Sequence, residues 1–208
     1  MKPTIIPSII AQTQKELNER LRKVFDYSTT VHLDIMDGKF VKNTSLLFDF
    51  KIVSGKMYQA HLMMNDPLSW IKKNYQKVDE IIIHGESNEI EESLKLIKKL
   101  KKGAGLAINP ATFLSRLHFI DLKRVDLLLI MTVEPGKYGS PFLSTMLTKV
   151  TQARSVYPKK DILVDGGIDA STIDQARTAG ANQFVIGSFL QNSRNVERDY
   201  KRLESFLR

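Results

Sequence analysis

The sequence predicts an α/β protein in which parallel strands close into a single-domain (β/α)8 TIM barrel. Short apolar runs that fit β-strands alternate with longer segments that have the spacing of amphipathic helices, as is typical of parallel βαβ units. The alternation repeats eight times, and no Gly-x-Gly-x-x-Gly motif follows the first strand. These two features favour a closed barrel over an open doubly wound sheet.

The predicted strands are short and apolar, and polar residues stand at their carboxyl ends. The run Thr30–Met36 alternates apolar and polar residues and ends at an Asp37-Gly38 turn, whereas Glu80–His84 is compact and apolar. The full set of expected strands is Thr4–Ile10, Thr30–Met36, Met57–Met63, Glu80–His84, Ala104–Ile108, Asp126–Thr132, Asp161–Val164 and Gln183–Ile186.

Helical spacing marks the segments between these strands. Leu17, Leu21, Val24 and Phe25 share one side of the first helix, and Pro67 marks the start of another. Helices are expected over Gln14–Phe25, Leu68–Tyr75, Ile90–Lys102, Leu143–Tyr157, Ser171–Ala179 and Val196–Leu207, with short helical segments over Ser45–Ser54 and Thr112–Phe119. No linker-like segment interrupts them, so we expect one domain over residues 1–208.

Composition limits the classes of protein to which the chain can belong. Apolar residues make up 42% and charged residues 26%, as in ordinary globular proteins. No apolar run approaches the ~18–20 residues of a membrane span, and the proline-rich start does not read as a secretory signal. The absence of cysteine excludes disulfides and thiolate chemistry. We expect a cytoplasmic protein without a membrane partner.

The chain is basic, with a net charge of +8 from 31 Lys and Arg against 23 Asp and Glu. Such an excess can steer phosphates or bind nucleic acid without specificity. The densest basic stretch, 98–102, lies at the end of a predicted helix, where cations suit the helix dipole. A solvated helix end is the better interpretation, and we expect no nucleic-acid partner.

His32 and Asp34 lie two residues apart on one predicted strand, so their side chains project to the same side. Such a pair can ligate a metal, can act as an acid/base pair, or can be a buried histidine bonded to its neighbour. Other polar residues at the strand ends favour the metal, because His61 and Asp165 meet the same rim of a parallel barrel. His32, Asp34, His61 and Asp165 therefore form a predicted site for one divalent metal ion, such as Zn, Fe, Mn or Co.

Glycine-lined turns follow the last two predicted strands. Gly166 and Gly167 follow the seventh strand, and Gly187 and Ser188 follow the eighth. Backbone N–H groups in such turns hold phosphate, and this is a frequent phosphate position in the fold. We predict a phosphate-binding site here rather than glycines that only shape tight turns.

The chain resembles the ribulose-phosphate 3-epimerase family over almost its full length, from Pro7-Ser8 to Gly187-Ser188. Six motifs in order carry the resemblance: 32–41 (HLDIMDGKFV), 61–63 (HLM) with Pro67, 105–110 (GLAINP), 131–136 (MTVEPG), 164–168 (VDGGI) and 187–188 (GS). Each motif alone is modest, but the ordered set is specific.

The resemblance implies a metal-dependent epimerase that inverts carbon 3 of a ketose phosphate. It implies His32, Asp34, His61 and Asp165 as metal ligands, with Asp34 and Asp165 also serving as acid and base. Ser8, Met36, Met63 and Met131 match substrate-contacting positions, and we add Gly136 and Gly139 from the loop that covers the substrate in the family. Gly166, Gly167, Gly187 and Ser188 match its phosphate cradle. A homo-oligomer, dimer or hexamer, is also implied.

Three departures from the family pattern bear on substrate identity, and the first is the run 9–12 (IIAQ) after Ser8, where the family has a Leu-Ser-Ala type of run. After Gly136 the family usually continues with Phe, two glycines and Gln, whereas this chain has Lys137–Phe142 (KYGSPF), which predicts a stiffer covering loop. Lys42 stands where the family generally has Pro. Three hypotheses remain: an epimerase for ribulose 5-phosphate and xylulose 5-phosphate, a 3-epimerase for a hexulose phosphate such as allulose 6-phosphate, or a sugar-phosphate-binding relative without turnover.

Overall fold

Eight parallel strands close into a barrel in the computed structural model, which describes residues 2–136 and 139–207. The barrel strands are β1 (Thr4–Ile9), β2 (Thr30–Asp37), β4 (Met57–Met63), β5 (Glu80–His84), β6 (Gly103–Ile108), β7 (Leu127–Met131), β8 (Asp161–Asp165) and β9 (Gln183–Ile186). The first strand pairs with both β2 and β9, which closes the ring. The predicted TIM barrel is confirmed.

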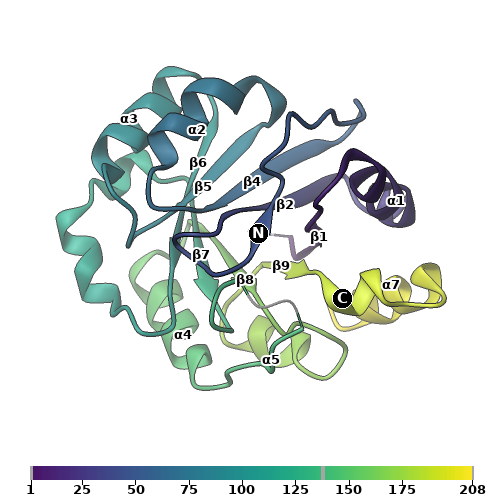
Figure 1. Cartoon of the computed structure of the whole chain (residues 1–208). Helices are drawn as coiled ribbons and strands as arrows, with labels where there is room; N and C mark the ends of the chain where they lie inside the picture. The colour runs from purple at the N-terminus through teal and green to yellow at the C-terminus, as the bar shows by residue number, and fades with distance from the viewer. Residues whose placement is uncertain (1, 137–138, 208) are drawn as a thin grey trace.

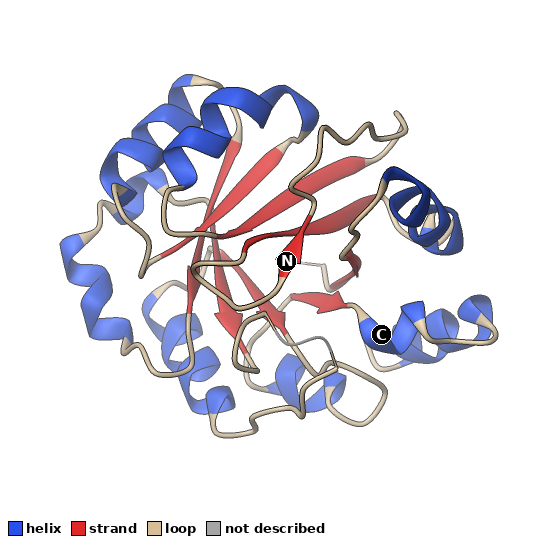
Figure 2. Cartoon of the chain, viewed as in Figure 1, coloured by secondary structure: helices blue, strands red, loops and turns tan. Residues whose placement is uncertain are grey.

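Helices form a ring outside the barrel, and the strands occupy its centre (Figures 1 and 2). The α-helices are α1 (Gln14–Val24), α2 (Pro67–Asn74), α3 (Ile90–Lys99), α4 (Met146–Val156), α5 (Ile173–Thr178), α6 (Ser188–Gln191) and α7 (Val196–Ser205). Three short 3₁₀ helices are η1 (Tyr75–Lys77), η2 (Leu114–Phe119) and η3 (Leu122–Arg124). Among the described residues, no helix is both long and apolar enough to cross a membrane.

Alternation along each strand divides the apolar residues between two cores. On β2, Val31 and Leu33 face outward and share a buried cluster with Leu17 and Leu21 of α1. A second cluster fills the barrel interior, with Leu129 and other buried side chains from β5 to β9. Burying one such aliphatic side chain contributes about 1.5–3 kcal/mol. The same alternation turns the even-numbered residues of β2 into the barrel, which is where the polar side chains of the site lie.

The segment 45–54 is not a helix, and that prediction is wrong. Leu46 has a left-handed backbone, with φ 54°, and its N–H donates to the carbonyl of Ala11. Lys51 bonds through both of its backbone groups to the side chain of Gln14, at the start of α1. Because neighbouring segments satisfy these backbone groups, Leu46 and Phe50 are buried without helical hydrogen bonds.

A two-residue strand, β3 (Thr44–Ser45), was not expected from the sequence; it runs antiparallel to the end of β2. The chain reaches it through the predicted Asp37-Gly38 turn, in which Gly38 has φ 75°. The carboxylate of Asp37 accepts the N–H groups of Lys39 and Phe40, both at 2.8 Å. This turn brings residues 39–45 over the mouth of the barrel.

In the second half of the chain, three helical segments differ from the prediction, and these differences shape the loops near the site. The fourth helix begins at Met146 rather than Leu143, because Leu143 donates its N–H to the carbonyl of Thr132 at 2.8 Å. The segment predicted as a short helix over 112–119 is the 3₁₀ helix η2, and α6 was not expected. That one domain spans all of 1–208 stays a prediction.

Candidate active site

A cavity of about 330 Å³ opens where the barrel strands end. Its size lies at the lower end of the range of small-molecule sites, which suits a small ligand. Apart from His32 and His61, every site residue predicted from the sequence lines it: Ser8, Asp34, Met36, Met63, Met131, Gly136, Gly139, Asp165, Gly166, Gly167, Gly187 and Ser188.

The four predicted metal ligands come together beside this cavity. One ligand atom from each of His32, Asp34, His61 and Asp165 lies within 4.8 Å of the other three. Asp34 and His61 occupy paired positions on β2 and β4, and Asp165 reaches them from β8 across the barrel. Nδ1 of His61 lies 3.1 Å from Oδ1 of Asp34 and 3.6 Å from Oδ2 of Asp165.

Hydrogen bonds orient the ring of His32 toward the cluster. Nδ1 of His32 lies 3.0 Å from Oε1 of Gln59, and the amide nitrogen of Gln59 donates to Glu80 at 2.7 Å. Since the amide oxygen can only accept, we assign the proton of His32 to Nδ1. Its Nε2 is buried without a hydrogen-bond partner among the described residues and lies 3.5 Å from Oδ1 of Asp34.

These donors fit a divalent transition metal. Two imidazole nitrogens and two carboxylates converge, and a buried imidazole lone pair without a partner costs free energy unless something binds it. Imidazole and carboxylate together suit zinc, iron, manganese and cobalt. The structure therefore contains a candidate His/Asp metal site, and its chemistry leaves the identity of the metal open.

The two carboxyl groups have pKa values shifted in opposite directions. Burial alone would raise the pKa of Asp34, but the adjacent imidazoles of His32 and His61 outweigh it and hold the pKa well below its usual range. Burial and the negative charge of Asp34 raise the pKa of Asp165 to about 7. Burial lowers the pKa of His61 to about 3, so this ring is neutral at neutral pH. Opposite shifts in a shared site are typical of acid/base pairs.

His61 also bonds on its other side, to a residue that the sequence did not single out as functional. Its Nε2 lies 2.9 Å from Nε2 of His84, at the end of β5, and Nδ1 of His84 lies 3.3 Å from Oε2 of Glu86. Burial would raise the pKa of Glu86, but bonds from His84, Thr112 and Asn109 outweigh it and lower the pKa. Glu86 is therefore a carboxylate at neutral pH.

Gln59, His84 and Glu86 are the residues of this region that sequence reasoning missed. A signal existed for each of them. Gln59 shares a strand face with His61 two residues on, and His84 is a strand-end histidine followed by Glu86 two residues later. What the sequence could not supply was the pairing across β2, β4 and β5, which joins them to the ligand histidines.

At the other end of the cavity, backbone geometry requires glycine. Gly166 and Gly167 have φ 112° and 65°, in the region that side chains rarely adopt. A Cβ on Gly166 would lie 2.3 Å from Cγ2 of Val133, and one on Gly167 would lie 2.8 Å from the backbone of Phe142. The hydroxyl of Thr132 stabilises this turn, because its oxygen lies 2.9 Å from the carbonyl oxygen of Asp165 and 2.6 Å from that of Gly166 and can donate its single proton to either one.

Gly187 and Ser188 stand at the start of α6, and both line the cavity beside the glycine turn. Gly136 approaches Val41 from the opposite loop, where a Cβ would lie 2.5 Å from Cβ of Val41. Lys42 also lines the cavity. Of the divergent loop Lys137–Phe142, residues 137 and 138 lie outside the described part, so its expected stiffness stays a prediction.

Comparison with known proteins agrees with this geometry. The model of the ribulose-phosphate 3 epimerase family matches residues 4–191. The chain belongs to this family. It is 35% identical to the ribulose-phosphate 3-epimerase of Buchnera aphidicola, with 96% of this chain and 94% of that protein covered. It is 32% identical to a protein of Oryza sativa named as the cytoplasmic isoform of the enzyme, with 89% and 84% covered.

Solved structures support the fold independently. The chain aligns with 3-keto-L-gulonate-6-phosphate decarboxylase from Vibrio cholerae with a TM-score of 0.75, over 100% of this chain and 98% of the other, at 12% identity. At that identity the likeness concerns the barrel alone. Family membership makes the chain an enzyme of the isomerase class, as the sequence predicted.

Proposed function

We propose that this family member interconverts D-ribulose 5-phosphate and D-xylulose 5-phosphate by inverting carbon 3. The observation that carries the proposal is the pair Asp34 and Asp165, which face one cavity and have pKa values shifted apart. Inversion beside a carbonyl requires one group that takes a proton from one face and another that returns a proton to the other face. Two carboxyl groups from different strands of the barrel suit that requirement.

The reaction starts when a carboxylate accepts the proton of carbon 3. The C–H bond breaks, and its electron pair forms the double bond of an enediolate between carbons 2 and 3. The second carboxyl group then delivers its proton to the opposite face of carbon 3, which restores the ketone with inverted configuration. Asp34 and Asp165 exchange these roles in the reverse direction. Without a bound cation, burial and the negative charge of Asp34 raise the pKa of Asp165 to about 7, so that in this state the carboxyl group can hold or release a proton at neutral pH.

His32, Asp34, His61 and Asp165 are the residues that would hold one divalent metal ion. When bound, such an ion supplies positive charge that offsets the negative charge developing on the enediolate oxygens. The unpartnered Nε2 of His32 and the carboxylates around Nδ1 of His61 support this assignment. The buried setting strengthens each charge interaction in the site.

The remaining cavity residues bind the substrate in this proposal. Gly166, Gly167, Gly187 and Ser188 offer backbone N–H groups to the phosphate, near the start of α6. Ser8 supplies a hydroxyl, and the buried Met36, Met63 and Met131 surround the reacting carbons with apolar, polarizable groups. Gly136 and Gly139 shape the loop over the sugar.

A 3-epimerase for a hexulose phosphate is the second candidate. One observation favours it: Lys42, which replaces the usual proline of the family, lines the cavity and offers a charge to a longer sugar. A sugar-phosphate-binding protein without turnover is the third candidate. Both carboxylates and both ligand histidines argue against it, because phosphate binding alone requires only the glycine turns.

Solvent deuterium exchange followed by NMR tests the proposal on protein of determined metal content. With ribulose 5-phosphate in D₂O, we expect deuterium at carbon 3 and formation of xylulose 5-phosphate. Exchange with allulose 6-phosphate alone would establish the second candidate. If metal is bound and neither substrate shows exchange, the result would support the third candidate, a sugar-phosphate-binding protein without turnover.

The homo-oligomer, dimer or hexamer, and the cytoplasmic location stay predictions. Leu47, Val53 and Met57 are large apolar side chains that are about half exposed on and beside the 46–56 segment, which is compatible with a covered surface. Light scattering coupled to gel filtration measures the oligomeric state directly.

A further inference from the structure

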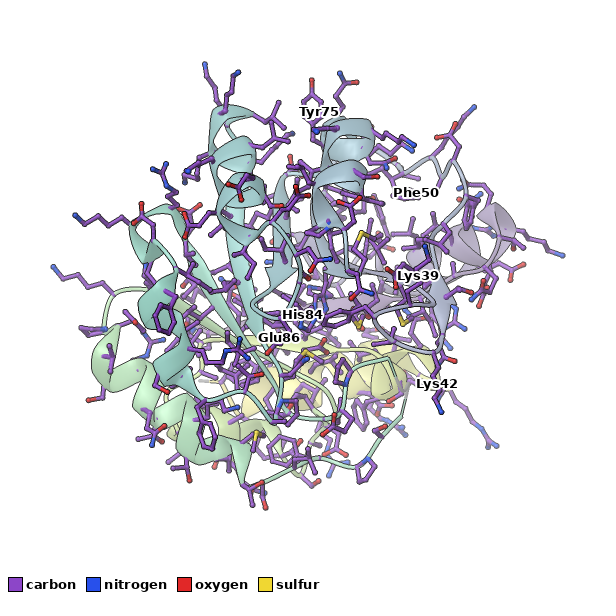
Figure 3. The ribbon with its side chains drawn as sticks, turned by 60° about the vertical axis from the view of Figure 1, so that its left-hand side comes forward. Lys39, Lys42, Phe50, Tyr75, His84 and Glu86 are labelled. Carbon is purple, nitrogen blue, oxygen red and sulfur yellow. The ribbon has the colours of Figure 1, made fainter. Side chains whose placement is uncertain are left out.

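A chain of three side chains leads from the candidate metal site to a carboxylate in the next layer. Nε2 of His61 meets Nε2 of His84 at 2.9 Å, and Nδ1 of His84 meets Glu86 at 3.3 Å. The two imidazole planes differ by 19° with centroids 4.9 Å apart, so the rings meet nearly in one plane, edge to edge. Figure 3 shows His84 and Glu86 together near the middle of the view, whereas Lys42 lies toward its edge.

Glu86 is held firmly at the outer end of this chain. Its Oε1 accepts the N–H of Asn109 at 3.1 Å. Lys149 of α4 is 9% exposed and donates to the carbonyls of Asn109, Pro110 and Thr112, which fixes the loop that carries this N–H group. The ring of Phe40 covers His84 with a centroid distance of 4.7 Å. Neither His84 nor Glu86 lines the cavity, so contact with a substrate does not account for the presence of these two side chains behind the site.

The hydrogen bond between the rings of His61 and His84 can run in either of two directions. In the first, His84 donates from Nδ1 to Glu86 and accepts at Nε2 from His61, which leaves Nδ1 of His61 bare. In the second, His84 donates from Nε2 to Nε2 of His61, and the bond to Glu86 is lost because Nδ1 of His84 is then bare and faces a carboxylate that can only accept. Two acceptors in contact repel each other, so the first arrangement is unfavourable at Asp34 and the second is unfavourable at Glu86.

A divalent cation bound by both Nδ1 of His61 and Asp34 would remove the repulsion between these two groups, which is the unfavourable contact of the first arrangement. The same cation would not relieve the repulsion between Nδ1 of His84 and Glu86 in the second arrangement. We infer that His84 and Glu86 are positioning residues that hold His61 as its Nε2–H tautomer and thereby strengthen cation binding at His32, Asp34, His61 and Asp165. A carboxylate that polarises a ligand imidazole raises its basicity as a ligand. The inference rests on the metal site of the proposed function.

Zinc affinity, measured by competition with a chromophoric chelator, tests the inference without any turnover. We expect His84→Leu and Glu86→Gln each to raise the Kd for Zn²⁺ by about 10- to 100-fold, which is a weaker affinity. His84→Gln should retain much of the affinity, because its amide oxygen can accept the Nε2–H of His61. Glu91→Gln is the matched control, since Glu91 also accepts a backbone N–H, from Asp121 at 2.8 Å, but has no histidine partner among the described side chains.

Histidine ¹⁵N NMR of the zinc-loaded protein reports the tautomers directly. We expect His84 to be protonated at Nδ1 and bare at Nε2, and Glu86→Gln to weaken this preference. If folded His84→Leu and Glu86→Gln bound zinc as tightly as the parent protein, or if Nε2 of His84 carried the proton, this inference would be overturned. The metal site of the proposed function would be unaffected by that result. Failure of the parent protein to bind Zn²⁺ would overturn the metal site of the proposed function and this inference with it. Should His84→Leu not fold, Glu86→Gln and the NMR spectrum decide the question.

Discussion

Nδ1 of His61 lies 3.1 Å from Oδ1 of Asp34, and both groups are buried at the mouth of the barrel. The contact joins neighbouring strands, because the two residues are paired in the β2–β4 register. It places an imidazole nitrogen and a carboxylate where one cation can touch both. It also leaves the carboxylate of Asp34 at the edge of the cavity, where a substrate can reach it.

The two carboxyl groups have separate tests. We expect Asp34→Asn and Asp165→Asn each to slow exchange of the carbon-3 proton by about 10²- to 10⁴-fold or more, because an amide cannot take up the proton. Proton NMR in D₂O measures the exchange, and circular dichroism checks that the barrel survives. Near-normal exchange in either variant would contradict the two-carboxylate mechanism.

The raised pKa of Asp165 predicts a pH-dependent stability in chelator-treated protein. The folded group has a pKa of about 7, against about 3.9 for an unperturbed aspartate. Between those values the folded state binds a proton that the unfolded state has released, so the free energy of unfolding falls as pH rises from about 4 to about 7.

Urea unfolding across that pH range, with Asp165→Asn as the comparison, isolates this group. We expect the stability of the parent to decline toward neutral pH relative to the variant, which lacks the titrating carboxyl group. A constant difference between the two proteins would show that Asp165 does not titrate in this range.

Gln59 orients His32, so its loss should act on metal binding. In Gln59→Leu, Nδ1 of His32 and the carboxylate of Glu80 lose their shared partner. We expect zinc affinity to fall by about 10- to 100-fold and the free energy of unfolding to fall by about 1–3 kcal/mol. Isothermal titration calorimetry and urea unfolding measure the two effects.

Gln183→Leu serves as the matched control for Gln59→Leu. Gln183 also lies on a barrel strand, and its amide oxygen has no hydrogen-bond partner among the described residues. Zinc affinity should be unchanged in this variant. An equal loss in both variants would mean that Gln59 acts only through general packing.

The glycine turn can be tested with a single methyl group. Gly166→Ala places a Cβ 2.3 Å from Val133 at φ 112°, and we expect the free energy of unfolding to fall by about 2–6 kcal/mol from strain and overpacking together. Gly55→Ala is the control, since Gly55 has φ 97° but no atom within 4 Å of its added Cβ.

Thermal unfolding of both variants separates the two contributions. Gly55→Ala should lose about 1–3 kcal/mol, from backbone strain alone. A variant of Gly166 that remains folded should also bind the sugar phosphate more weakly, because the turn moves away from Val133. Equal stability in the two variants would show that the contact with Val133 is easily relieved.

Local rules were enough to predict the order of the eight barrel strands and to select four candidate metal ligands. The limits of β4, β5 and β9 match the predicted strands, because compact apolar runs between polar breaks define them. Period-two alternation placed His32 and Asp34 on one face, and strand-end polarity selected His61 and Asp165. All of these ligand atoms lie together in the structure.

Predictions from the sequence were wrong where hydrogen bonds between distant segments determine the backbone conformation. The run 45–54 is apolar enough for a helix, but Ala11 and Gln14 bond its backbone and keep it out of a helical conformation. The late start of α4 also arises from a contact beyond the local sequence, the bond from the N–H of Leu143 to the carbonyl of Thr132. Intrinsic helix propensity is weak, so tertiary hydrogen bonds override it.

The sequence by itself determined which residue types reach the mouth of the barrel, because the side-chain period of a strand is a local property. Only the tertiary structure decided which of them touch. Closure through the pairing of Ser8 with His32 curves the sheet until Asp165 of β8 meets Asp34 of β2. The pairing of β2 with β4 sets Gln59 against His32, and the neighbouring strands β4 and β5 bring His61 and His84 together. Contacts between strands depend on register and curvature, which are set by the whole ring of hydrogen bonds rather than by any one segment.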